Sequence, residues 1–284
     1  MCNIAVHPRV QVELRAWPAD GSAQLRVEAP GVPGPHPLVE AAAEEIGIPE
    51  GLRIELRVNG DAPAGSSMGT SAAVAVAVAA VVEALVGTAP PRSPYALAMA
   101  AHRAEYVRCR RQCGVQDQLA AAYGGVNWIE VVDFPNATVT RIPTPTELDG
   151  ALHVVLLGAH DSSAVHEQVI ASLSPDSTVL ERLRRCAVAG RDALLARDLP
   201  AFGRAMIANT EAQEELHPAL VGSAAHEAIG VARASGALGW KVNGAGGEGG
   251  SLTVLGGEAR QLVDAGLALL PVAISAEGVR FDLS

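Results

Sequence analysis

Basic residues are scarce in this chain of 284 residues. Lysine and arginine together number 21 against 31 aspartates and glutamates, which gives a net charge of −10. Non-specific nucleic-acid binding needs a basic surface that displaces phosphate counterions, so nucleic acid is not expected as a partner. A local site for a small anionic ligand stays compatible with this balance. Lys241 is the only lysine, which points to compositional bias unless Lys241 lies inside a motif.

Cysteine is also scarce, with four residues in the whole chain. That is too few for a disulfide framework in a chain of this length. His102 and Cys109 are separated by two helical turns, roughly 10 Å, which is too far for them to share one zinc ion. The first residues, MCNIAVHPRVQV, contain no basic region followed by a continuous apolar run. We therefore expect ordinary thiols, no secretory signal and a cytoplasmic location.

A long hydrophobic run is missing as well. The most membrane-like stretch, residues 72–82, is interrupted by Glu83, whereas a membrane-spanning helix needs about 20 apolar residues. We expect a buried helix there and no membrane partner. Hydrophobic residues make up 49% and charged residues 18% of the chain, which is typical of a globular protein with one large domain or two modest ones.

Hydropathy patterns predict an α+β protein with two lobes, each combining a sheet with helices on one face. A Pro/Thr-rich stretch at residues 141–150 is the best candidate boundary, so we predict lobes at 1–148 and 149–284. Strands are expected at 3–17, 23–29, 52–58, 126–134, 137–142, 151–158, 238–244, 250–256, 267–276 and 279–284. The strands at 126–134 and 137–142 should form a hairpin-like pair. Helices are expected at 37–48, 69–87, 92–110 (with Ser93 as its N-cap) and 115–125, three or four times between about 163 and 235, and near 257–266.

The most informative local feature is the Gly/Ser-rich loop DAPAGSSMG, which runs directly into the Ala/Val-rich helix. A helix N-terminus carries unpaired backbone N–H groups and a partial positive charge, and glycines let the backbone curl around an anion. This loop is therefore a candidate phosphate cradle, and the hydroxyls of Thr70 and Ser71 could reach phosphate or Mg²⁺. The alternative is a plain loop before a core helix. The loop is not a Walker A motif, because no Gly-Lys-Ser/Thr follows it.

A second glycine loop, KVNGAGGEGGSLTVL, begins at Lys241. It contains the spacing G-x-G-x-x-G, but a dinucleotide-binding site requires a helix directly after the loop. A strand pattern follows instead, so we reject that interpretation. A glycine-rich turn between two strands still allows a ligand or another loop to approach closely.

A third segment, AEYVRCRRQCGVQDQLAAAYGGVNWIE, brings together Glu105 and Asp117. A single aspartate at a helix start is most often a cap or a solvated charge, so Asp117 is a catalytic candidate only in combination with the two loops. Four arginines are expected within reach of these carboxylates: Arg103, Arg108, Arg110 and Arg111.

In this order, the three segments resemble the GHMP kinase superfamily, which includes galacto-, homoserine, mevalonate and phosphomevalonate kinases. The resemblance covers essentially the whole chain. The wording Q-D-Q…A-A-Y-G-G…N…I-E is most similar to the branch of heptose (heptose-7-phosphate) kinases and fucokinase-type sugar kinases, as is the segment LLGAHDSSAVHEQV at 156–169.

The resemblance implies a first lobe like ribosomal protein S5 domain 2, a ferredoxin-like second lobe and an active site in the cleft between them. It also implies a small-molecule kinase that transfers the γ-phosphate of ATP, with Mg²⁺, to a hydroxyl of a sugar or sugar phosphate. Asp117 matches the acidic residue that orients or deprotonates this hydroxyl, and an aspartate beside arginines should stay ionised.

Other site residues are implied by motif position. The triphosphate would lie against Pro63, Gly65, Ser66, Ser67, Gly69, Thr70 and Ser71 of the first loop and Gly244, Gly246 and Gly247 of the second. Mg²⁺ would be held by Ser71 and Glu105. The acceptor would contact Gln116, Gln118, Asp161 and Ser162, with His160 as a weaker candidate.

The sequence departs from the family pattern at its start. MCNIAV matches the strand after the family's first motif, so either the natural start lies upstream or another basic residue, Arg110 or Arg111, replaces the basic residue of that motif. Ser67 stands where glycine is usual, and Glu248 should face away from the phosphates or contact metal or substrate. Two alternatives therefore stay open: a nucleotide- or metabolite-binding homologue with little or no kinase activity, and a kinase of a non-sugar alcohol.

Overall fold

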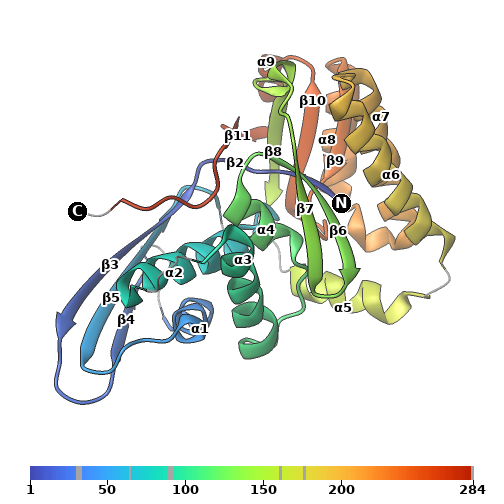
Figure 1. The fold of residues 1–284 in the computed structure, drawn as a ribbon. Coiled ribbons are helices and arrows are strands. Elements are labelled where there is room, and N and C mark those ends of the chain that lie inside the picture. Colours follow the sequence, from blue (N-terminus) through green and yellow to red (C-terminus); the bar gives the residue numbers. More distant parts are fainter. Residues whose placement is uncertain (30–33, 64, 88–91, 160–161, 175–176, 283–284) are drawn as a thin grey trace.

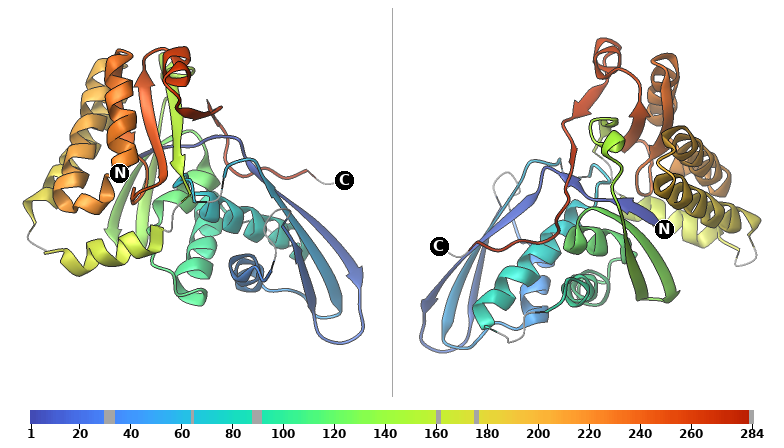
Figure 2. Two further views of the ribbon diagram at one scale, coloured as in Figure 1. Left: turned by 180° about the vertical axis from the view of Figure 1, so that it is seen from behind. Right: turned by 45° about the horizontal axis from the view of Figure 1, so that its top comes forward.

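The computed structural model describes residues 1–29, 34–63, 65–87, 92–159, 162–174 and 177–282. Helices and strands form two lobes that meet along the middle of the molecule (Figures 1 and 2). This confirms the predicted α+β class with two lobes.

The outer sheet of the first lobe has the order β3-β5-β4. Strand β3 (Val10–Pro18) is antiparallel to β5 (Leu52–Gly60), and β4 (Gln24–Glu28) is parallel to β5. A parallel pair needs a crossover connection, and α1 (Pro37–Ile46) supplies it between β4 and β5. Helices α1 and α2 (Thr70–Val86) pack on one face of this sheet (Figure 1).

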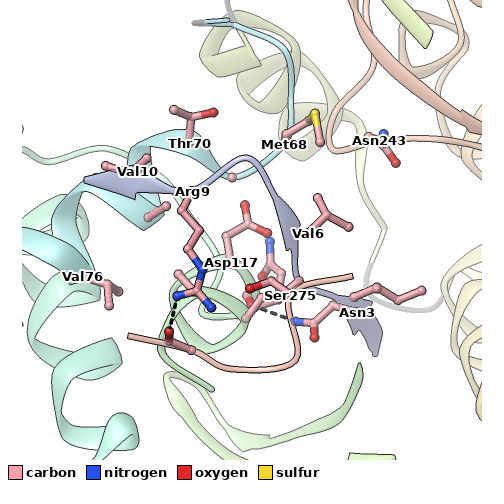
Figure 3. A pocket seen from close by; sticks show the side chains of 18 of the residues that line it. Asn3, Val6, Arg9, Val10, Met68, Thr70, Val76, Asp117, Asn243 and Ser275 are labelled. Carbon is pink, nitrogen blue, oxygen red and sulfur yellow. Dashed lines mark hydrogen bonds between the residues drawn. The ribbon is translucent and has the colours of Figure 1, made fainter. Parts of the chain in front are cut away.

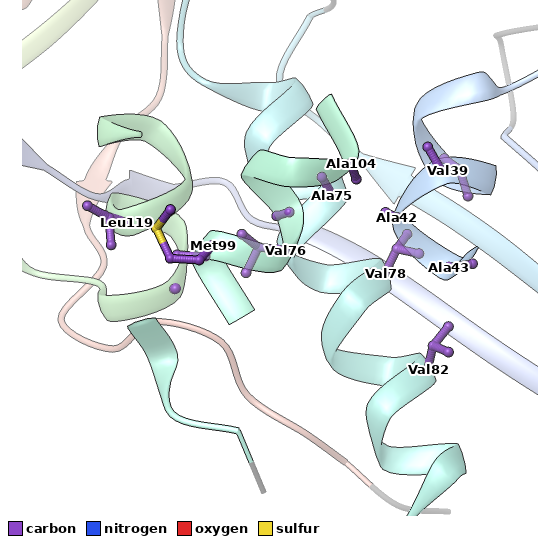
Figure 4. Close-up of a cluster of buried hydrophobic side chains, with 14 of the residues drawn as sticks. Val39, Ala42, Ala43, Ala75, Val76, Val78, Val82, Met99, Ala104 and Leu119 are labelled. Atoms are coloured by element: carbon purple, nitrogen blue, oxygen red, sulfur yellow. The ribbon is translucent and has the colours of Figure 1, made fainter. Parts of the chain in front are cut away.

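Helix α2 is apolar on nearly all sides because the core surrounds it. Its side chains pack against α1, the sheet, α3 (Pro94–Arg103) and α4 (Gln116–Tyr123) (Figure 4). Val76, Val78 and Val82 are at most 1% exposed, and burial of each such side chain contributes roughly 1.5–3 kcal/mol. The many alanines let neighbouring helices approach closely, so the N-terminus of α2 is held on a rigid support.

A second sheet, β1-β6-β7, lies between this core and the other lobe. Strands β6 (Val126–Asp133) and β7 (Asn136–Ile142) form the predicted hairpin, and β1 (Cys2–Ile4) pairs with β6. Val126 and Trp128 pack with Leu152, Phe202 and Leu255 of the second lobe in one hydrophobic cluster. The two lobes therefore share a continuous apolar contact.

The second lobe contains the antiparallel sheet β11-β8-β10-β9. Its strands are β8 (Leu152–Gly158), β9 (Ala237–Val242), β10 (Gly250–Gly256) and β11 (Ala268–Leu270). With helices between β8 and β9 and α9 (Ala259–Asp264) between β10 and β11, this is the β-α-β-β-α-β pattern of a ferredoxin-like fold. The other helices are α5 (Ser162–Ser172), α6 (Thr178–Leu195), α7 (Leu199–Leu216) and α8 (Ser223–Ala234).

Three sequence predictions of strands need correction. The strand expected at 267–276 is two strands, because β11 pairs with β8, whereas β12 (Ala273–Ile274) pairs with β2 (Val6–His7). The single strand expected at 3–17 is three strands, because β1, β2 (Val6–His7) and β3 pair with three different partners: β6, β12 (Ala273–Ile274) and β5. The strand expected at 279–284 is wrong for its described part, 279–282, which pairs with no strand. Instead, the guanidinium of Arg9 donates hydrogen bonds to the carbonyl oxygens of Glu277 and Gly278, both at 2.6 Å.

The chain returns to the first lobe at its end. Strand β12 pairs with β2, and the amide of Val279 donates to the carbonyl of Ala122 in α4. The division at 148/149 stays a prediction. In the described ranges, no helix combines the length and apolar character needed to cross a membrane.

Gly203 in α7 provides a test of how the second lobe is packed. A Cβ at Gly203 would lie 2.2 Å from the carbonyl oxygen of Leu238. We expect Gly203→Ala to destabilise the protein by about 1–3 kcal/mol, since the backbones of α7 and β9 would have to separate. The measurement is the free energy of unfolding in urea.

Gly230 in α8 is the matched control, because a Cβ there meets nothing within 4 Å. Gly230→Ala should stabilise the protein by about 0.5–1 kcal/mol through helix propensity. Equal effects of the two substitutions would contradict the described contact between α7 and β9.

Candidate functional site

A cleft of about 2160 Å³ separates the two lobes. Small-molecule sites usually measure about 300–1,000 Å³, so this cleft has room for two ligands side by side. Both lobes contribute to its walls: β3, α2 and α4 from the first, and β8, β9, β10, α6 and α7 from the second. Figure 3 shows Asn3, Arg9, Thr70, Asp117 and Asn243 around this space.

The N-terminus of α2 opens into the cleft. Gly69 is its N-cap in the left-handed conformation, with φ of 70°, and among the described residues no side chain caps the helix. Ser67, Met68, Gly69 and Thr70 line the cleft. The first amides of a 17-residue helix are therefore available to an anion, with the helix dipole adding positive potential.

Asp117 lies in the first turn of α4, directly against the start of α2. A Cβ built on Gly69 would lie 3.2 Å from both Cβ and Cγ of Asp117. The carboxylate is accessible from the cleft, yet the protein atoms crowded around it raise its pKa to about 6, with a further contribution from the charge of Glu105. Asp117 is thus a carboxylate that exchanges its proton near neutral pH.

The arginines expected beside the two carboxylates are placed elsewhere. Arg103 and Arg108 both donate to Glu45 of α1, at 2.6 and 2.7 Å. Arg110 and Arg111 are exposed, and neither lines the cleft. The expectation that arginine keeps Asp117 ionised is therefore wrong. The sequence around Arg103 and Arg108 does not show that Glu45, on the distant helix α1, binds both of them.

Glu105 lies behind Asp117 in the π-helical segment Ala104–Arg108, where it is 6% exposed. Its Oε2 accepts a hydrogen bond from Nε2 of Gln118, at 2.9 Å, and Gln118 is itself buried. Gln118 therefore orients Glu105 and is covered by protein, whereas Gln116 lines the cleft.

The second glycine loop meets the first. A Cβ on Gly244 would lie 3.1 Å from Cβ of Ser67, and Gly244 lines the cleft. The hydroxyl of Ser251, at the start of β10, donates to the carbonyl of Ser66, at 2.6 Å, with both residues buried. This contact ties the phosphate-cradle candidate of the first lobe to the sheet of the second.

Gly246 serves the packing of the second loop. It has φ of 61°, and a Cβ there would lie 1.8 Å from the carbonyl oxygen of Leu220. The carboxylate of Glu248 accepts from the hydroxyl and amide of Ser223, at 2.8 and 3.2 Å, at the start of α8. Glu248 therefore faces away from the cleft, which agrees with the first of the two alternatives stated for it: facing away from the phosphates, or contacting metal or substrate.

The structure brings part of the predicted site together. The predicted residues that line the cleft are Ser67, Gly69, Thr70, Gln116, Asp117 and Gly244. The other described residues of the predicted site do not line the cleft: Pro63, Gly65, Ser66, Ser71, Glu105, Gln118, Gly246 and Gly247. His160 and Asp161 lie outside the described residues, as does the side chain of Ser162.

Sequence reasoning missed several cleft residues. Arg9 follows β2 and lines the cleft, with its guanidinium directed at the backbone carbonyl of Gly278 (Figure 3). Lys241, Asn209, Gln213 and Asn243 line the wall of the second lobe. For Lys241 and Asn243 a signal existed, since both belong to the motif KVNGAGG. Asn209 and Gln213 lie in α7, and no sequence motif marked them.

No described group of three or more His, Cys, Asp and Glu side chains could hold a metal ion by itself. Magnesium is usually held by one or two carboxylates together with substrate phosphates and water. Asp117 and Thr70, which line the cleft beside the phosphate-cradle candidate, fit this pattern, whereas Glu105 is buried behind Asp117.

The comparisons with known proteins agree with this architecture. Residues 37–125 match the family model described as GHMP kinases N terminal domain. No curated protein matches the chain significantly.

Three solved structures illustrate the similarity. Homoserine kinase from Cytophaga hutchinsonii superposes with a TM-score of 0.71 and 20% identity, covering 98% of this chain and 90% of that one. A D-glycero-D-manno-heptose 1-phosphate kinase from Bacteriodes thetaiotaomicron gives 0.68 and 20%, with 94% and 85% covered. L. major mevalonate kinase gives 0.74 and 18%, with 95% and 87% covered. The chain thus has the GHMP kinase fold, and its first lobe matches the N-terminal domain of that superfamily over residues 37–125.

Proposed function

We propose that this protein is a small-molecule kinase that transfers the γ-phosphate of ATP to a hydroxyl group of a sugar or sugar phosphate, with a heptose as the favoured sugar. The observation that carries this proposal is the contact between Asp117 and the uncapped N-terminus of α2 on the floor of a two-ligand cleft. An anion-binding helix end beside a carboxylate of raised pKa supplies the two halves of a phosphoryl transfer site.

The first half of the site is the binding of the triphosphate. Backbone amides from Ser67 to Thr70 would hold its oxygens, and the dipole of α2 would stabilise charge on the γ-phosphate. Ser71 at the start of α2 and Gly246 and Gly247 in the second loop act in this proposal by shaping the two loops. Gly244 allows the second loop to close over the first, since a side chain there would meet Ser67.

The second half is the activation of the acceptor hydroxyl. Asp117 would accept a hydrogen bond from this hydroxyl, orient it toward the γ-phosphate and take up its proton as the new P–O bond forms. With a pKa of about 6, Asp117 is largely ionised at neutral pH and is a stronger base than an ordinary aspartate.

A magnesium ion would fit between the triphosphate and Asp117. The hydroxyl of Thr70, which lines the cleft, would be its protein ligand, and the carboxylate of Glu105, which Gln118 holds in place, would add negative charge behind Asp117. When bound, Mg²⁺ neutralises charge on the phosphates.

Polar side chains among the residues that line the cleft, such as Asn3, Gln116 and Asn209, support a sugar or sugar phosphate as the acceptor. Asn3 donates to the backbone carbonyl of Gln116, at 2.9 Å, and both residues line the cleft. Amide groups of this kind suit the hydroxyls of a sugar. The structurally similar heptose 1-phosphate kinase supports the same class.

The decisive assay is ADP release from Mg-ATP over a panel of acceptors: heptose 1-phosphate, heptose 7-phosphate, free sugars, homoserine and mevalonate. We expect turnover with a sugar or sugar phosphate and a loss of about 10²–10⁴-fold in kcat for Asp117→Asn, because the base is removed. Turnover only with homoserine or mevalonate would show that the acceptor is a non-sugar alcohol. ATP binding without any turnover would favour a binding homologue.

Activity should depend on pH through Asp117. Since its pKa is about 6, kcat/KM should fall about tenfold per pH unit below pH 6, where the carboxylate becomes protonated. The rate profile between pH 5 and 8 measures this. A flat profile down to pH 5 would show that another group accepts the proton.

The stability of Asp117→Asn provides a second check on the same group. Its folded-state pKa lies above the ordinary value near 4, so ionisation of Asp117 opposes folding above pH 6. Asp117→Asn should therefore raise the Tm at pH 7–8, and this gain should disappear as the pH falls from 6 to about 4. A lower Tm at pH 8 would contradict the raised pKa.

Gly69→Ala tests the contact between α2 and α4. The new methyl group would displace Asp117, and a displacement of about 1 Å at a reacting group can lower kcat about 100-fold. Gly87→Ala at the other end of α2 is the matched control, because φ is nearly the same, 68° against 70°, and nothing lies within 4 Å.

Both variants should lose about 1–2 kcal/mol of stability through backbone strain, but only Gly69→Ala should lose activity. Chemical denaturation and the ADP-release assay give the two values. An active Gly69→Ala enzyme would show that the contact with Asp117 does not position the base.

A further inference from the structure

The only lysine of the chain faces the cleft. Lys241 lies in β9 between Trp240 and Val242, whose side chains belong to the hydrophobic core on the other face of the sheet. Side chains alternate along a strand, so Lys241 points to the opposite face, where it lines the cleft.

Two neutral oxygens hold its ammonium group. Nζ donates to Oε1 of Gln213 in α7, at 2.8 Å, and to the carbonyl of Val242, at 2.6 Å. Gln213 is buried and fixed in turn, because its Nε2 donates to the carbonyl of Gly244, at 3.1 Å. The ammonium is thereby held in one position at the wall of the cleft.

This positive charge has no carboxylate partner within the described parts of the chain. Burial lowers the pKa of Lys241 to about 8, and no charged neighbour contributes to this shift. The group stays largely protonated at neutral pH. Buried charges in proteins are usually paired, and an ammonium has three donors, of which two are used here. The remaining donor and the charge suit an anion.

The surroundings suit an anionic ligand as well. Asn209, Asn243 and Thr253 line the same wall and are neutral. The hydroxyl of Thr253 donates to the side-chain oxygen of Asn243, at 2.9 Å, which fixes both groups. A preorganised ammonium with neutral polar neighbours is a favourable setting for a charge-assisted hydrogen bond.

We propose that Lys241 binds an anionic group of the acceptor, a phosphate or a carboxylate, so that the enzyme selects acceptors that carry negative charge in addition to the reacting hydroxyl. This inference rests on the proposed kinase function and specifies its substrate class. The triphosphate of ATP already has backbone donors at the start of α2. Lys241 lies on the sheet of the second lobe, whereas these donors and Asp117 belong to the first lobe.

A single lysine makes the test direct. Growth on ¹³C-labelled lysine places the label at Lys241 alone, because it is the only lysine, and leaves its ammonium group with all three donors. Lys241→Arg, which carries no label, confirms the assignment of the Cε resonance. Inorganic phosphate is then titrated against chloride at constant ionic strength, and the Lys241 resonance and its pKa are followed by two-dimensional NMR.

We expect phosphate to shift the Lys241 resonance saturably and to raise its pKa, and to do so equally in the presence of saturating Mg²⁺ and the ATP analogue AMP-PNP. A resonance that does not respond to phosphate would overturn the inference. A response that AMP-PNP abolishes would overturn it too, because Lys241 would then contact the nucleotide.

Kinetics give an independent readout on the acceptor panel. Lys241→Gln should raise KM for a sugar phosphate about tenfold or more relative to the unphosphorylated sugar, and leave KM for ATP nearly unchanged. Lys241→Arg should restore part of the preference, since the charge returns. An unchanged preference in Lys241→Gln would contradict the inference.

The outcomes separate this inference from the proposed function. If phosphate shifts Lys241 but no acceptor is phosphorylated, the kinase proposal fails and the anion site stands. If acceptors are phosphorylated but neither NMR nor the Lys241→Gln preference responds, the anion site fails and the kinase proposal stands.

Discussion

The close approach of α4 to the N-terminus of α2 is the constraint on which the candidate site depends. Glycine suits position 69 best, because a Cβ would crowd Asp117 at 3.2 Å and φ is positive. Behind this contact, the alanine-rich body of α2 is packed on several sides, so its first amides cannot drift away from the carboxylate. The hydrogen bond from Ser251 to Ser66 extends the same constraint to the second lobe.

Electrostatics in the cleft follow from this packing. Crowding and the charge of Glu105 make Asp117 a better base, whereas burial without a carboxylate partner leaves Lys241 as an isolated cation on the other wall. The protein as a whole is acidic, with a net charge of −10. Attraction of anionic ligands therefore depends on fixed local groups of the cleft, among them the helix amides, Arg9 and the held ammonium of Lys241, and not on the surface at large.

Sequence reasoning succeeded where the signal was local. The apolar run of α2, the cap of α3 by Ser93 and the turn of the β6–β7 hairpin depend on neighbouring residues, and all were predicted. It failed where distant segments compete for one group. The residues around Arg103 do not predict its ion pair with Glu45. Those around Arg9 do not predict its hydrogen bond to Glu277 near the end of the chain. Asp117 was predicted as a site residue because three weak motifs occurred in order, and this role stays a prediction; its raised pKa could be derived only from the packed structure.

The most direct test of the proposed function is a crystal structure with Mg²⁺ and AMP-PNP. The phosphates should lie on the amides of Ser67 to Thr70 at the start of α2, with the terminal phosphate facing the carboxylate of Asp117 across a space open to the acceptor. A nucleotide bound elsewhere, or with its terminal phosphate turned away from Asp117, would contradict the assignment of this cleft as a phosphoryl transfer site.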